Sequence, residues 1–134
     1  MPITTTPPTA TKTSRKDIAT TFLRMSATAD VRAAFDHYIG RDFRHHNPSF
    51  RGDAKTLAAG MADNAKQNPD KVFDIEHALE DGDLVAVHSR VRMRPDGQEM
   101  AVVHVFRFVG DRIVELWDVG QPVPADSPNE NGMF

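Results

Sequence analysis

The spacing of hydrophobic residues changes near residue 70. Before that point, apolar side chains recur every three or four positions, which is typical of helices with one buried side. After it, four apolar-rich runs are separated by turn-forming residues, a pattern that predicts strands. The runs cover residues 72–79, 84–93, 99–109 and 113–121. Helices followed by strands predict an α+β domain whose strands form an antiparallel meander through three successive hairpins.

Three helices are predicted in the first half of the chain. Ile18 and Phe22 recur at helical spacing in the first of them. Asp30 is a suitable N-cap for the second, whose apolar positions extend to Ile39. Gly40 is then placed to end this second helix, because glycine readily adopts the backbone conformation found just beyond a helix.

An extended segment, residues 41–52, separates the second helix from the third. It contains His46 and Asn47, followed by Pro48, which biases Asn47 toward an extended conformation. The third helix is expected to open at Asp53 and to end near residue 68.

The two ends of the chain differ from its body. Residues 1–14 are rich in Thr and Pro, which predicts a disordered arm ahead of a single domain at 15–134. The polar tail ends in Met133 and Phe134. This apolar terminus favours docking onto the body or onto a neighbouring subunit, although a loose tail is an equal alternative.

Composition narrows the functional classes. A length of 134 residues is typical of one domain, and the net charge of −3 with no basic stripe argues against nucleic-acid binding. The absence of cysteine excludes disulfides and thiol catalysis. No run of about eighteen apolar residues predicts a membrane span, and no secretory signal begins the chain. We therefore expect a cytoplasmic protein.

The last hairpin can be given a register from the chemistry of its pairs. A three-residue loop at 110–112 places Arg107 opposite Glu115 and His104 opposite Asp118, whereas a two-residue loop gives poorer partners. The other pairs in this register are Val109 with Ile113, Phe108 with Val114, Phe106 with Leu116, and Val105 with Trp117.

The pairing of His104 with Asp118 is the main chemical feature predicted from the sequence. Both residues fall on a face that also carries Phe106, Phe108, Leu116 and Val114. A carboxylate and an imidazole on an apolar wall can move protons near neutral pH. The alternative is a buried ion pair without chemistry, since structural networks also perturb pKa values.

The opposite face of this hairpin is apolar as well, and carries Val103, Val105, Trp117 and Val119. A sheet with two apolar faces needs cover on both sides, and three helices can cover only one. We therefore predict a homodimer that packs through this second face.

Other polar residues are candidates for binding a ligand. His88 lies on the second strand, while His46, Asn47 and Gln121 could supply hydrogen bonds at the mouth of the sheet. Together with the His104–Asp118 pair these histidines would permit a metal site. However, no HxH or HExxH spacing occurs, so we favour a site without metal or cofactor.

Several segments together resemble the SnoaL-like proteins, a group of the NTF2-like superfamily that includes polyketide cyclases. The resemblance covers about residues 22–134. It lies in the order and spacing of residues 42–48 (DFRHHNP), 84–88 (LVAVH), 103–107 (VHVFR), 115–119 (ELWDV), 121–124 (QPVP) and 131–134 (NGMF).

The resemblance implies a cone-shaped fold, with a strongly bent sheet, a deep pocket and dimers packed through the sheets. Polyketide cyclases of this group catalyse an intramolecular aldol condensation without a cofactor. Asp118 matches their acid/base aspartate and His104 their pocket histidine, while His46 matches the histidine of an HNP-type motif. Many relatives carry an acid where this chain has His104.

These observations lead to one main hypothesis and two alternatives. The main hypothesis is a cofactor-independent acid/base enzyme acting on a small carbonyl compound by aldol condensation, cyclisation or isomerisation. Asp118 and His104 would be catalytic, and the substrate would contact His46, Asn47, His88, Phe106, Trp117 and Gln121. The alternatives are a pocket protein that binds a small molecule without chemistry, and an enzyme in which Asp118 activates water.

Overall fold

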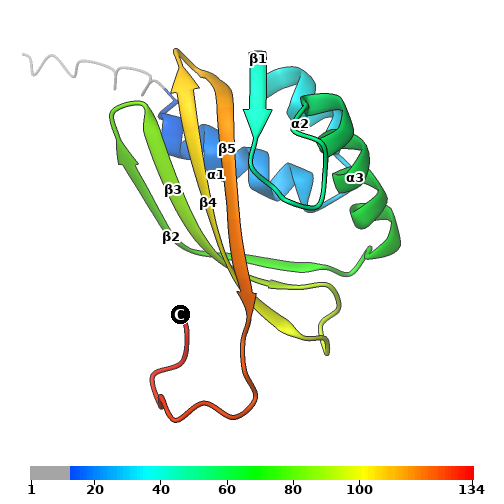
Figure 1. The fold of residues 1–134 in the computed structure, drawn as a ribbon, viewed down its shortest axis with the longest axis vertical. Coiled ribbons are helices and arrows are strands. Elements are labelled where there is room, and N and C mark those ends of the chain that lie inside the picture. Colours follow the sequence, from blue (N-terminus) through cyan, green and yellow to red (C-terminus); the bar gives the residue numbers. More distant parts are fainter. Residues whose placement is uncertain (1–12) are drawn as a thin grey trace, which may run out of the picture.

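The computed structural model describes residues 13–134, so the predicted arm lies almost wholly outside the described residues. The chain forms three helices and five strands (Figure 1). These are α1 (Arg15–Ser26), α2 (Val31–Tyr38), β1 (Ile39–His45), α3 (Ala54–Gln67), β2 (Val72–Asp81), β3 (Leu84–Arg92), β4 (Glu99–Val109) and β5 (Arg112–Pro122). Among residues 13–134, none of the helices combines the length and apolar character that a membrane crossing requires.

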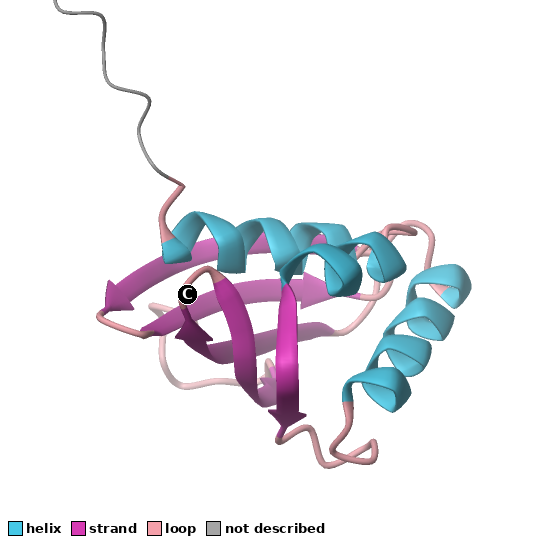
Figure 2. Cartoon of the chain, turned by 90° about the horizontal axis from the view of Figure 1, so that it is seen from above, coloured by secondary structure: helices cyan, strands magenta, loops and turns pink. Residues whose placement is uncertain are grey.

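The strands form one curved sheet in the order β1-β5-β4-β3-β2, and the three helices lie on one side of it (Figure 2). The predicted α+β class and the antiparallel meander of β2 to β5 are thus confirmed. Phe22 of α1 packs edge-on against Phe106 of β4, with 6.0 Å between ring centroids, and close to Phe35 of α2. This aromatic contact joins the helices to the inner face of the sheet.

The second helix ends earlier than predicted, because Ile39 and Gly40 belong to β1 rather than to the end of α2. Strand β1, which was not predicted from the sequence, runs parallel to β5 and makes the sheet mixed. A Cβ atom on Gly40 would lie only 3.0 Å from the Cβ of Arg112 on β5. The close approach of two strands therefore favours glycine here, and Gly40 does not end a helix.

The β4–β5 register agrees with the prediction over most of its length and differs at the turn. Arg107 lies opposite Glu115, and His104 lies opposite Asp118, as expected. The loop, however, has two residues, Gly110 and Asp111, and a bulge at Val114 restores the predicted register beyond it. In consequence Ile113, not Val114, faces Phe108 and enters the core.

The outer face of the sheet remains largely open in the single chain. Val119 and Val103 are 66% and 37% exposed on this face. The C-terminal tail covers part of it, because the ring of Phe134 stacks on His88 at 5.5 Å and lies against the guanidinium of Arg90. Of the two possibilities for the tail, docking onto the body of its own chain is the one observed.

Glu115 links β5 to its two neighbouring strands, β1 and β4, on this outer face. Its carboxylate accepts a hydrogen bond from Arg44 of β1 at 2.9 Å, faces Nε2 of His46 at 2.7 Å, and lies 3.4 Å from Nε of Arg107 on β4. The hydrogen bonds from Arg44 and His46 outweigh the opposing effect of burial and lower the pKa of Glu115 to about 2.

This lowered pKa predicts how stability depends on acid. The stabilisation from Glu115 should be fully present above the ordinary glutamate pKa of about 4.5 and be lost as pH falls toward about 2. Glu115→Gln should therefore have a lower free energy of unfolding at pH 7, and the difference from wild type should shrink as pH falls through this range. Urea denaturation at a series of pH values measures this difference. Glu130→Gln, in the exposed tail, is the control, and a constant difference for Glu115→Gln would contradict the prediction.

Candidate functional site

A cavity of about 250 Å³ lies between the inner face of the sheet, α1 and α3. Asn47, His104 and Asp118 line it together, each brought there by a different segment of the chain. His104 and Asp118 come from the paired strands β4 and β5, and Asn47 comes from the loop that follows β1. Most of the remaining wall is apolar, which suits a small organic ligand.

The His104–Asp118 pair predicted from the sequence lies at this cavity. Nε2 of His104 is 3.6 Å from Oδ2 of Asp118, and their side chains are 10% and 28% exposed. The imidazole ring lies near the rings of Phe73 and Phe106, with centroids at 6.3 and 6.2 Å. An ionised carboxylate only accepts hydrogen bonds, so the nitrogen that faces it carries the proton.

Asn47 is the second group that contacts the Asp118 carboxylate. Its Nδ2 donates to Oδ2 of Asp118 at 2.9 Å, and its Oδ1 accepts from the backbone N–H of Ser49 at 2.9 Å. The bond to Ser49 fixes which end of the amide is the oxygen, and therefore which end faces Asp118. The Asn47 side chain is thus oriented before any ligand arrives.

His45 holds the Asn47 backbone in place. Its Nδ1 accepts from the backbone N–H of Asn47 at 3.1 Å, and its Nε2 lies 2.5 Å from the carbonyl oxygen of Arg51. These partners require a proton on Nε2 and a lone pair on Nδ1. We did not identify this positioning role from the sequence. The adjacent pair His45–His46 was its only visible signal, since strand alternation sends one of two neighbours inward.

Opposing effects set the pKa of Asp118. Burial is the largest and raises it, but the interactions with His104 and the hydrogen bond from Asn47, with a smaller contribution from His45, outweigh burial. The net result is a pKa below the ordinary aspartate value. Asp118 is therefore a carboxylate at neutral pH, ready to accept a proton rather than to donate one.

The two oxygens of this carboxylate are not equivalent. His104 and Asn47 both approach Oδ2, whereas Oδ1 accepts no hydrogen bond from any described residue. Because Asp118 keeps part of its side chain exposed, Oδ1 is the atom that can meet a ligand. The geometry thus separates an oxygen with two polar partners from one without a hydrogen-bond partner among the described residues.

The other predicted ligand-binding residues do not line this cavity. His46 lies on the outer face, stacked on Trp117 with 5.1 Å between centroids and bound to Glu115. His88 is also outside, stacked on His77 and on the C-terminal ring. Gln121 is exposed and contacts Met133, and Phe106 is fully buried in the core beside His104. Of these six residues, only Asn47 lines the cavity together with His104 and Asp118.

One charged residue of the cavity was not identified from the sequence. Lys71, just before β2, lines the wall together with Asn64 of α3. Its signal in the sequence was weak, a single lysine directly ahead of the apolar run that begins at Val72.

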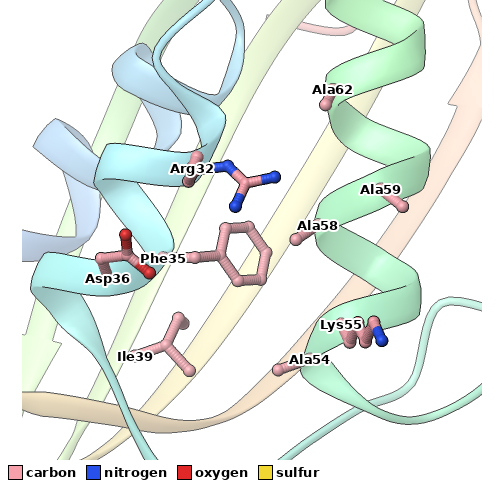
Figure 3. A pocket seen from close by; sticks show the side chains of 9 residues that line it. All are labelled: Arg32, Phe35, Asp36, Ile39, Ala54, Lys55, Ala58, Ala59 and Ala62. Carbon is pink, nitrogen blue, oxygen red and sulfur yellow. The ribbon is translucent and has the colours of Figure 1, made fainter.

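A different hollow, of about 430 Å³, lies between α2 and α3 (Figure 3). Alanines of α3 and the ring of Phe35 form its walls, and Arg32, Asp36 and Lys55 stand at its edge. None of the residues predicted to be catalytic or to bind substrate lines it. The cavity at Asp118 is the better candidate because it joins apolar walls to converging polar groups.

The described residues hold no group of three or more side chains suited to binding a metal ion. Asp118 and His104 approach each other, but the remaining neighbour, Asn47, already donates to the carboxylate. The arrangement therefore fits proton transfer better than metal coordination.

Comparison with known structures supports the fold. An NTF2-like protein from Cytophaga hutchinsonii superposes with a TM-score of 0.68 at 16% identity, covering 84% of this chain and 95% of that one. A proposed polyketide cyclase from Streptomyces antibioticus superposes at 0.63 and 22% identity, covering 81% and 92%. Another, from Acidithiobacillus ferrooxidans, gives 0.64 and 21%, covering 81% and 89%. Identities this low establish a shared architecture only.

A search of curated protein sequences finds no match to the chain. The model of the SnoaL-like domain, by contrast, matches residues 19–116, which include β1, the loop with Asn47 and most of the sheet. The match covers most of the chain, and it agrees with the NTF2-like architecture. The chain therefore belongs to the SnoaL-like domain family.

Proposed function

We propose that this protein is a cofactor-independent acid/base enzyme that removes a proton from the carbon next to a carbonyl group. The observation that carries the proposal is the Asp118 carboxylate, which lines a largely apolar cavity, is contacted at Oδ2 by Asn47 and His104, and accepts no hydrogen bond at Oδ1 from a described residue. A base fixed in this way meets the geometric requirement for proton abstraction.

The proposed reaction begins when Oδ1 of Asp118 takes the proton and the C–H electron pair becomes part of an enolate. Asp118 then returns the proton that it took to the enolate or to the alkoxide that follows, and His104 assists this transfer by holding the carboxylate through Nε2. In an aldol reaction, the enolate carbon would attack a second carbonyl of the same molecule. In an isomerisation, the proton would return to a different carbon.

The structural neighbours are consistent with this type of chemistry. Proteins from Streptomyces antibioticus and Acidithiobacillus ferrooxidans that share the fold are named as proposed polyketide cyclases. Their low identity makes them support for the class of reaction only, since one fold hosts many functions.

A second candidate function is the binding of a small molecule without chemistry. The lowered pKa of Asp118 favours it, because a carboxylate with a low pKa is a weak base but a good acceptor for a ligand hydroxyl. The same three polar residues would then serve recognition alone.

Replacing Asp118 separates the two candidates. Wild-type protein should accelerate hydrogen–deuterium exchange at the acetyl methyl group of acetophenone in D₂O, measured by proton NMR. Asp118→Asn should lower this exchange by about 100-fold or more, because the general base is lost. Asp111→Asn, at the exposed turn of the same hairpin, is the matched control and should keep wild-type activity.

Two outcomes would count against the proposal, the first against catalysis and the second against Asp118 as the base. Exchange no faster than in buffer, together with acetophenone binding that Asp118→Asn weakens only modestly, would favour the binding protein. Undiminished exchange in a folded Asp118→Asn variant would remove Asp118 as the base.

We also propose that the protein is a homodimer packed through the outer face of the sheet. Val119 and Val103 leave apolar surface exposed there, beside Trp117 of β5. An apolar sheet face of this kind is stabilised by a second layer.

Charge placed on this face should therefore dissociate the dimer. Val119→Glu should shift the mass in sedimentation velocity from dimer to monomer, because a carboxylate would be buried without a partner. Val109→Glu is the control, since Val109 is equally exposed but lies at the end of β4 beside the turn. A wild-type protein that sediments as a monomer at micromolar concentration would contradict the proposal.

A further inference from the structure

Lys71 contributes a positive charge to the cavity that contains Asp118. It lies between α3 and β2, is half-buried, and lines the wall beside Phe73. Its Nζ donates to Oδ1 of Asn64, which lines the same cavity. Burial lowers the pKa of Lys71, since removing an ammonium group from water disfavours its charged form.

Within the described part of the chain, no carboxylate forms an ion pair with Lys71. Its partner Asn64 is neutral and satisfies one of three ammonium donors. A structural lysine would normally extend its charge into water, as Lys66 does on the exposed side of α3. Lys71 instead keeps a partly desolvated charge beside an apolar cavity, which an anionic ligand would compensate.

Phe73 lines the same cavity as Lys71, His104 and Asp118. Lys71 and Phe73 are two positions apart, so that their side chains fall on the same side of an extended chain. The Phe73 ring in turn lies 6.3 Å from the ring of His104. A ligand lying along Phe73 could therefore place one end at Lys71 and the other near Asp118.

The space between these ends is small and apolar. At the packing density of protein interiors, a cavity of 250 Å³ holds a ligand of about a dozen non-hydrogen atoms. Met61, Met93 and Met100 form part of its wall, and methionine side chains adapt readily to a flat ring. These limits favour a compact, largely apolar molecule over a long chain or a multi-ring system.

We propose that the substrate is a small carbonyl compound bearing a carboxylate, and that Lys71 with Asn64 binds this carboxylate while the carbonyl end lies at Asp118. The inference rests on the proposed function for the carbonyl end only. Lys71 is a specificity-determining residue in this arrangement and takes no part in proton transfer.

The test compares two probes of the same shape, 4-acetylbenzoate and its neutral counterpart 4-acetylbenzamide. Wild-type protein should bind the carboxylate about tenfold more tightly or better in isothermal titration calorimetry, because a charge-assisted contact is added. Lys71→Gln should abolish this preference and Lys71→Arg should retain much of it. Lys66→Gln, which removes an exposed lysine of α3, should leave it unchanged. Equal binding of both probes by wild type, or an unchanged preference in Lys71→Gln, would overturn the proposal.

Exchange at the acetyl group of 4-acetylbenzoate, followed in the same samples, distinguishes this proposal from the proposed function. Asp118→Asn should lose exchange and still prefer the carboxylate, whereas Lys71→Gln should lose the preference and need a higher concentration of 4-acetylbenzoate for half-maximal exchange. A preference for the carboxylate without exchange in wild type would contradict catalysis and support the Lys71 anchor. Exchange in wild type without a preference for the carboxylate would support catalysis and contradict the Lys71 anchor.

If circular dichroism shows that Lys71→Gln does not fold, Lys71→Met and the wild-type comparison of the two probes decide the question.

Discussion

The register of β4 against β5 is the constraint on which the rest of the structure depends. In a strand, a slip of one residue moves every side chain to the opposite face. The bulge at Val114 makes this slip once, so that Ile113 near the turn and Leu116 farther along both reach the core. Without the extra residue, the same turn would direct Asp118 outward and away from the cavity that His104 lines.

The bulge also sorts the charged groups of β5 onto two faces. Glu115 is directed outward, where Arg44 and Arg107 balance its charge and connect three strands. Asp118 is directed inward, where the neutral amide of Asn47 and the imidazole of His104 hold it without a permanent cation. One carboxylate therefore joins strands, and the other is left with an oxygen free for a ligand.

The sequence allowed most of the sheet to be predicted, because opposite charges and matched apolar pairs identify the partner of each position across a hairpin. The bulge at Val114 could not be predicted. A two-residue loop followed by one bulged residue in β5 gives the same pairs far from the turn, such as His104 with Asp118, as a three-residue loop without a bulge. The strand containing Gly40 lacks alternation, and its parallel partner lies some seventy residues away. Only that pairing decides that Asn47 faces the cavity while His46 and Trp117 stack outside.

The charges around the cavity are balanced unequally by the chain itself. Asp118 receives a hydrogen bond from Asn47 and the interaction with His104, and these more than offset the cost of its burial. Lys71 receives one neutral contact from Asn64, and burial remains the effect that moves its pKa. The fold therefore compensates its partly buried anion, Asp118, and leaves its partly buried cation, Lys71, dependent on what enters the cavity. A neutral ligand would remove more water from the ammonium group of Lys71 without supplying an opposite charge, whereas a carboxylate would offset the cost of that desolvation. This asymmetry gives the cavity a direction, with the anionic end of a ligand at Lys71 and its reactive end at Asp118.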